Sequence, residues 1–170
     1  MIIINMYLMK RIVLLTIMSL FSLSLIAENR WYLTPGYMGN VELGVGSTTS
    51  RELNTTVLTS HGFTNGKGWY FGVGTGLSYS DCVTIPVFAD VKYSIYDKIV
   101  SPFVSLKFGT DITAESAGVY CSPSVGMDYR NVSILLKYDM ATGKDWSDPF
   151  GGEEFLVDKH AFSVGLALWF

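Results

Sequence analysis

The last eleven residues of the chain, 160–170, alternate between large apolar side chains and mostly small ones. One side of this segment carries Phe162, Val164, Leu166, Leu168 and Phe170, and the other carries Ala161, Ser163, Gly165, Ala167 and Trp169. Successive side chains of a β-strand point to opposite faces, so a two-residue period is typical of a strand. The segment is therefore predicted to be a strand with one fully apolar face that ends on an aromatic residue.

Seven further segments show the same two-residue period, so the chain from Gly36 onward divides into eight strands. The seven segments span residues 37–46, 55–63, 69–79, 85–94, 102–109, 119–129 and 132–140. The clearest is 69–79, where Trp69, Phe71 and Val73 begin an apolar side opposite a row of glycines. Most of these segments are close to the roughly 9 to 11 residues that a tilted strand needs to cross a bilayer.

The connections between these segments alternate between short and long. The short ones are residues 64–67, 96–98 and 130–131, and the longer ones are 47–54, 80–84, 111–116 and 141–159. Membrane barrels with an even number of strands place short turns and both chain ends on the periplasmic side, and longer loops on the outer side. The pattern predicts an all-β fold, an eight-stranded antiparallel up-and-down transmembrane β-barrel.

The composition favours a barrel whose apolar side faces lipid. Charged residues make up 16% of the chain, against about 25% in soluble domains, and the mean hydropathy is +0.31. After residue 26, no apolar run approaches the roughly 20 residues of a membrane helix. The alternative, a soluble barrel with its apolar side inward, would crowd Trp69, Phe71 and Tyr138 into a narrow interior and leave a sparsely charged face in water.

The N-terminal region has the pattern of a cleavable signal peptide. Lys10 and Arg11 precede an apolar run over residues 12–26, which is followed by the small residue Ala27 and then by polar residues. We expect a signal peptide over 1–27 and a barrel domain over 28–170; an uncleaved anchor is the alternative, and either Met1 or Met9 could be the start. Without Lys10 and Arg11 the net charge is 10 − 15 = −5, which argues against a nucleic-acid partner.

The small side of the predicted strands carries charged residues that would lie inside the barrel. These are Glu42, Asp90, Lys92, Lys107, Asp128, Lys137 and Asp139. Because an isolated charge in a narrow lumen is costly, four acids and three bases there predict an internal ion-pair network. Phe88, Phe103, Tyr120 and Trp169 lie on the same side, so we expect a lumen filled by side chains rather than a wide pore.

Several strands resemble those of a known class of proteins. The segments 36–44, 59–63, 71–79, 85–90, 101–107 and 120–126, together with the C-terminal strand, resemble the small outer-membrane β-barrels of Gram-negative bacteria, with an architecture similar to the membrane domains of OmpA and OmpX. The resemblance implies an outer-membrane location, contact with outer-membrane lipid and recognition by the barrel-insertion machinery. In that family the insertion signal is the closing strand, here Phe162, Val164, Leu166, Leu168 and Phe170. We expect a monomer.

The resemblance identifies no activity, and the residues favour a structural or surface-interaction role. The long outward segment 141–159 carries the candidate contacts for an extracellular ligand: Trp146, Phe150, Glu153, Glu154 and Phe155. The alternatives are a narrow porin-like channel and a lipid-modifying outer-membrane hydrolase, such as a lipid A-modifying enzyme, because some barrels of this kind are hydrolases.

The sequence offers no catalytic, cofactor or metal residues that we would assign. Ser60 and His61 are neighbours on a strand and point to opposite faces, so they cannot form a nucleophile and base pair, although Thr59 shares a face with His61. The glycines at 72, 74 and 76 are followed by no helix and are not a dinucleotide fingerprint. Cys82 and Cys121 could pair or remain free thiols.

Overall fold

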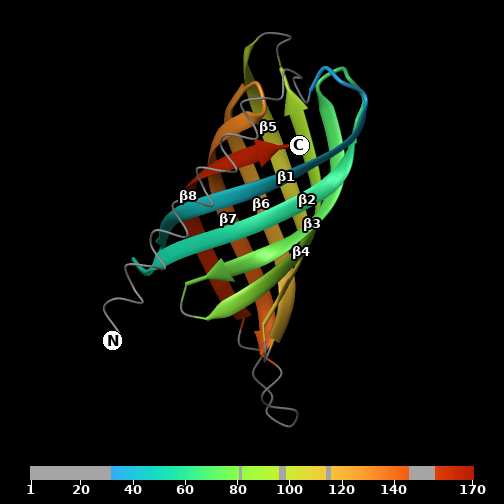
Figure 1. Ribbon diagram of the computed structural model, residues 1–170. Coiled ribbons are helices and arrows are strands. Elements are labelled where there is room, and N and C mark those ends of the chain that lie inside the picture. Colours follow the sequence, from blue (N-terminus) through green and yellow to red (C-terminus); the bar gives the residue numbers. More distant parts are fainter. Residues whose placement is uncertain (1–31, 81, 96–98, 114–115, 146–155) are drawn as a thin grey trace, which may run out of the picture.

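The computed structural model describes residues 32–80, 82–95, 99–113, 116–145 and 156–170. Eight strands close into one barrel, each hydrogen-bonded to its neighbours in sequence and β1 to β8 (Figure 1). The strands are β1 (Gly36–Thr48), β2 (Leu53–Thr64), β3 (Trp69–Tyr79), β4 (Val83–Ser94), β5 (Val100–Ile112), β6 (Ser116–Tyr129), β7 (Val132–Asp145) and β8 (Leu156–Trp169). The predicted eight-stranded antiparallel barrel is confirmed. The predicted signal peptide lies outside the described residues.

Among the described residues, no helix has the length and apolar character that a membrane crossing requires.

Every strand pair is antiparallel, and the register determines the tilt of the strands relative to the barrel axis. A row of paired residues starts at Asn40 on β1 and passes through Ser60, Gly74, Phe88, Gly109, Tyr120 and Ala141 to Lys159 on β8. The Thr48–Ala161 pair, continued by two residues, places Lys159 opposite Ser50. The row that started at Asn40 therefore returns to the first strand 50 − 40 = 10 residues further along the chain. A stagger of this size in eight strands corresponds to a tilt of about 40°.

Several strands are longer than the alternation predicted, mainly at the long-loop end of the barrel. β5 continues to Ile112, and β7 and β8 pair as far as Lys144 with Leu156. The predicted loop over 141–159 is therefore wrong at both ends, and the connection is residues 146–155. The alternation fades because residues such as Ala141 and Thr142 are small or polar, while the backbone ladder needs no apolar face to continue.

The barrel has its apolar face outside and its charged face inside, which is the reverse of a soluble protein. On the outer face, Val73 is 69% exposed and Phe162 70% exposed, whereas Glu42 and Trp169 in the lumen are both 2% exposed. All eight strands contribute apolar side chains to the outer face. The soluble alternative, with its apolar face inward, is thereby excluded, because such an outer surface needs an apolar surrounding.

The chain preceding β1 folds against the mouth of the barrel at the short-turn end. Tyr32 is 1% exposed and packs with Tyr70 and Trp169, with Leu33 and Met38 beside them. Its carbonyl oxygen accepts a hydrogen bond from the amide of Gly68 in the β2–β3 turn, at 3.0 Å. This short segment, which the alternation does not predict, closes one end of the lumen.

Candidate functional site

The centre of the lumen holds one carboxylate between two lysines from distant strands. Glu42 on β1 pairs through Oε2 with Lys107 Nζ on β5 at 2.7 Å, and through Oε1 with Lys137 Nζ on β7 at 2.9 Å. All three side chains are buried. Lys137 Nζ also donates to Thr56 Oγ1 at 2.7 Å. The three charged side chains thus connect β1, β5 and β7, and Thr56 adds β2; the Glu42–Lys107 pair joins opposite walls of the barrel.

A second ion pair lies nearer the short-turn end, beside aromatic rings. Lys92 Nζ is 2.7 Å from Asp128 Oδ1 and donates to Ser133 Oγ at 2.8 Å. Ser133 Oγ also donates to Asp128. The ammonium lies 3.7 Å from the Phe103 ring centroid and 4.5 Å from that of Trp169. The aromatic faces therefore supplement the carboxylate in stabilising this buried cation.

The other two predicted acids differ in their partners. Asp139 Oδ2 lies 3.7 Å from Lys137 Nζ, and its Oδ1 accepts hydrogen bonds from Tyr120 Oη at 3.0 Å and Ser122 Oγ at 2.7 Å. Asp90 has no lysine or arginine of the described chain within 4.0 Å and accepts a hydrogen bond from Ser60 Oγ at 2.8 Å. The structure therefore places all seven predicted residues in the lumen and brings six of them into ion pairs, while Asp90 is held by a hydroxyl.

Large side chains fill the space around these charges. Leu58, Phe88 and Tyr120 form one buried cluster, and Phe103, Leu135 and Ala167 form another. Between Asp90, Lys92 and Trp169 lies a void of about 10 Å³, which is about the volume that a single water needs. In the described part of the chain the lumen is therefore a packed core of paired charges and large side chains.

The C-terminal strand closes the barrel through its terminal residue. The Phe170 amide donates to Gly39 O, and the Gly39 amide donates to Phe170 O, both at 2.9 Å. A Cβ atom on Gly39 would lie 2.8 Å from Phe170 Cε2, so the terminal ring occupies the space that a side chain would need. Of the residues predicted as an insertion signal, Phe162, Val164 and Phe170 are exposed on the outer face, and Leu166 and Leu168 are half-buried.

His61 lies beside this ring on the outer face and is part of a chain of hydrogen bonds that runs from Tyr37 to Asn40 O. Tyr37 Oη is 2.7 Å from His61 Nδ1, His61 Nε2 is 3.3 Å from Thr59 Oγ1, and Thr59 Oγ1 donates to Asn40 O at 2.9 Å. Because the hydroxyl hydrogen of Thr59 goes to the carbonyl, the consistent tautomer carries its hydrogen on Nε2 and accepts from Tyr37. His61 is then no base for Thr59, and Ser60 points into the lumen away from both.

The remaining predicted features are placed as follows. Cys82 and Cys121 are both free thiols. No group of three or more potential metal ligands occurs among the described residues. The five candidate contacts of the 141–159 segment, Trp146, Phe150, Glu153, Glu154 and Phe155, lie outside the described residues. Sequence reasoning missed Tyr32, for which the only signal was an aromatic residue just ahead of the first strand.

Comparison with known proteins identifies the fold and not a family. No known family matches the sequence, and no curated protein does. The crystal structure of the outer membrane enzyme PagL superposes with a TM-score of 0.58 at 10% identity, covering 76% of this chain and 98% of that one. The de novo designed barrel TMB2.3 gives 0.52 at 14% identity, over 84% and 97% of the two chains. The N-terminal β-barrel domain of Pseudomonas aeruginosa OprF gives 0.47 at 12% identity, over 81% and 100%.

The likenesses to PagL and TMB2.3 agree with the closed barrel described above. At such identities they extend to the fold alone, and the activity named for PagL is not carried over. The chain has the fold of the eight-stranded outer-membrane β-barrels, in the architecture of the small OmpA- and OmpX-like proteins.

Proposed function

We propose that the protein is a monomeric barrel of the outer membrane of a Gram-negative bacterium, with a structural or surface-interaction role and a closed lumen. The observation that carries this proposal is the inversion of the two faces, with exposed apolar side chains outside and buried ion pairs within. Such a surface is stable only against hydrocarbon. The outer-membrane proteins among the structural neighbours support the same location.

The packing of the lumen supports a structural role over conduction. Glu42, Lys107 and Lys137 connect opposite walls, and the void beside them measures about 10 Å³. The Tyr32 segment covers the mouth at the short-turn end. A permeating ion would have to displace both the ion pairs and the rings that surround them.

The shape of the long-loop end supports surface interaction. β6, β7 and β8 each have 14 residues, against 11 to 13 for the other five strands. The β7–β8 hairpin is formed by two of these long strands and carries the connection with Trp146, Phe150, Glu153, Glu154 and Phe155. A partner at the cell surface would contact these residues, which combine aromatic rings with carboxylates.

Two measurements test the proposal together. Separation of inner and outer membranes from cells that express the full chain should recover the protein in the outer-membrane fraction, folded and without its first 27 residues. Intact cells should then lose their binding to the surface partner when residues 147–154 are replaced by a short glycine-containing turn. Recovery of the folded protein in the soluble periplasmic fraction would contradict the proposal.

A further inference from the structure

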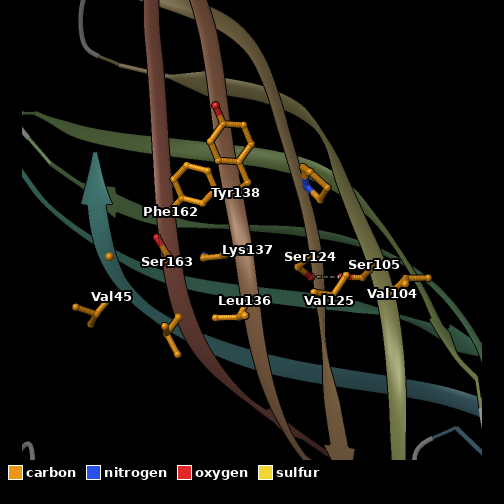
Figure 2. A pocket seen from close by; sticks show the side chains of 13 residues that line it. Val45, Val104, Ser105, Ser124, Val125, Leu136, Lys137, Tyr138, Phe162 and Ser163 are labelled. Carbon is orange, nitrogen blue, oxygen red and sulfur yellow. Dashed lines mark hydrogen bonds between the residues drawn. The ribbon is translucent and has the colours of Figure 1, made fainter. Parts of the chain in front are cut away.

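A furrow crosses the outer face of five neighbouring strands, from β5 through β6, β7 and β8 to β1 (Figure 2). One wall is the register row Val104, Val125, Leu136, Val164 and Val45. The other wall includes Pro123, Tyr138 and Phe162, each two residues away along its strand. The floor is the backbone of the row between the walls, from Ser105 to Gly46, and the volume is about 650 Å³.

Most of the side chains that line the furrow are short, and the ladder between two of its strands, β6 and β7, is interrupted; the β3–β4 ladder has a similar gap beside Pro86. Elsewhere on the outer face aromatic rings interlock, as where the Trp69 ring lies 5.7 Å from Phe71 and 4.6 Å from Tyr93. Pro123 has no amide hydrogen, and the β6–β7 pairs stop at Cys121 with Met140 and resume at Ser124 with Lys137. The furrow is therefore an apolar groove on the outer face, and it is open to the surroundings of the barrel along its whole length.

The dimensions of the furrow suit one extended chain. Two residues along a strand separate its walls by about 6.6 Å between Cα atoms, and four strand spacings give it a length of about 19 Å. An α-helix, about 10 Å across with its side chains, is too wide to enter. A linear hydrocarbon chain is narrow enough to lie along the furrow, over the inward-facing row that forms its floor.

The rise of the furrow along the barrel axis matches half of the thickness of the apolar layer of the membrane. The register row climbs toward the long-loop end in the direction from β5 to β1, because it returns 10 residues further along β1. At a tilt of about 40° its 19 Å length rises by about 12 Å, which is half of the roughly 25 Å apolar band of an outer-membrane barrel. The low end at Val104 then lies near the middle of the membrane and the high end at Val45 near its outer surface.

Polar groups gather just above the high end. Tyr138 Oη is 3.1 Å from His160 Nδ1, with the two rings stacked on the outer face. The turn after β1 is fixed to the same strand, since the Thr49 amide and Oγ1 both donate to His160 O. This turn also carries the exposed cation Arg51. An imidazole, hydroxyls and a guanidinium group are partners for the phosphate of a lipid head group.

We propose that the furrow holds one acyl chain of an outer-leaflet phospholipid, with the phosphate of its head group beside His160 and Arg51 and the methyl end of the chain near Val104. This lipid would stay bound longer than the lipids that surround the rest of the barrel. The inference rests on the membrane location proposed above. The proposed site differs from general contact with lipid because the chain lies on one face of the barrel, runs in one direction and has its head group at one end.

Photo-crosslinking in vesicles tests the site with defined probes. The full mature chain is inserted into vesicles of phosphatidylethanolamine and phosphatidylglycerol that contain phosphatidylglycerol with a diazirine either near the carbonyl group or at the methyl end of one chain. Adducts are mapped by mass spectrometry. We expect several-fold more adducts on the furrow walls than on Val73 and Val87, which lie outside the furrow on β3 and β4 and are 69% and 48% exposed. The carbonyl-side probe should label Phe162 and the methyl-end probe Val104.

A matched pair of variants separates the furrow from the general lipid contact. Val125→Trp places an indole in the furrow, whereas Val87→Trp adds the same bulk outside it, on the outer face of β4. Adducts on Leu136 and Val164 should fall several-fold in Val125→Trp and stay unchanged in Val87→Trp. Equal labelling of all outer faces, a reversed order of the two probes, or covalent dimers joined through the furrow would overturn the inference. Failure of the protein to insert at all would instead contradict the proposed function.

Discussion

Glu42 is the side chain on which the charge balance of the lumen depends most, because it pairs with two buried lysines. We predict that Glu42→Gln lowers the free energy of unfolding by about 3 to 5 kcal/mol, since the buried Lys107 and Lys137 both lose the carboxylate closest to them and Lys137 keeps only the more distant Asp139. Urea unfolding of the inserted protein in vesicles measures this loss.

Asp90→Asn is the matched control for that substitution. It removes a lumen carboxylate that accepts a hydrogen bond from Ser60 and has no lysine or arginine of the described residues within 4.0 Å, so the loss should be smaller than for Glu42→Gln, about 1 to 2 kcal/mol. In a double-mutant cycle, Lys107→Met should cost less in the Glu42→Gln background than in the native chain. Equal losses for Glu42→Gln and Asp90→Asn would show that the ion pairs contribute nothing particular.

Arg130 occupies a backbone conformation that L residues rarely adopt, with φ at 54° in the two-residue turn between β6 and β7. We predict that Arg130→Val lowers the free energy of unfolding by about 1 to 2 kcal/mol, because a β-branched side chain is strained at positive φ. Arg130→Asn, which also removes the guanidinium group but tolerates this conformation, should stay within about 0.5 kcal/mol of the native chain. A similar loss in both variants would assign the effect to the missing guanidinium group.

At the residue scale, strand alternation was sufficient to predict that seven charges face the lumen, because the side-chain period of a strand is two; it missed the buried Asp111, which lies beyond the predicted end of its strand. It could not predict which charges meet. The pairing of Glu42 with Lys137 joins strands at opposite ends of the sequence and depends on the 10-residue stagger, which only the closed register supplies.

At the level of the strands, closure of the barrel depends on how Phe170, the residue after β8, fits against β1. We predict that Gly39→Ala slows folding into vesicles severalfold, because its Cβ would lie 2.8 Å from the Phe170 ring and 3.0 Å from His61 Nδ1. The rate is followed by the shift in electrophoretic mobility between folded and unfolded barrels.

Phe170→Leu supplies the control for this steric argument. The smaller side chain leaves room for the added methyl group, so Gly39→Ala should slow folding less in the Phe170→Leu background than in the native chain. An equal effect in both backgrounds would mean that the Gly39 position acts through its backbone and not through the terminal ring.

The same scale shows where sequence reasoning failed. The centres of all eight strands were predicted, since lipid contact enforces the alternation there. The ends at the long-loop side were not, because β7 and β8 continue as a backbone ladder through Thr142 and Gly143, where no apolar face is required. Strand length beyond the membrane is therefore set by main-chain pairing that leaves little trace in the sequence.

For the molecule as a whole, a filled lumen predicts an absence of conductance. Planar bilayers that contain the inserted protein should show no discrete current steps in simple salt, while a porin inserted in the same way gives them. The reason is that ion pairs and aromatic rings occupy the lumen from the Tyr32 segment to Tyr120. Regular steps that vanish when the protein is omitted would contradict the closed barrel.

Fold class followed from sequence because alternation, connection lengths and low charge all point to the same architecture. The cap formed by Tyr32 did not, because a single aromatic residue outside any strand has no periodic signal. The furrow on the outer face also lay beyond prediction, since its two walls are aligned only by the register of five strands.

The most direct test of the account asks which face of the strands meets hydrocarbon. Nitroxide labels are attached singly at Val73, Leu136 and Val164, each replaced by cysteine in a chain with Cys82→Ser and Cys121→Ser, and Arg51→Cys serves as the water-exposed control. In vesicles, oxygen should relax the three outer-face labels far more strongly than a water-soluble nickel chelate does, with the reverse at Arg51. Strong relaxation of Val73, Leu136 and Val164 by the nickel chelate would place that face in water and contradict the central claim.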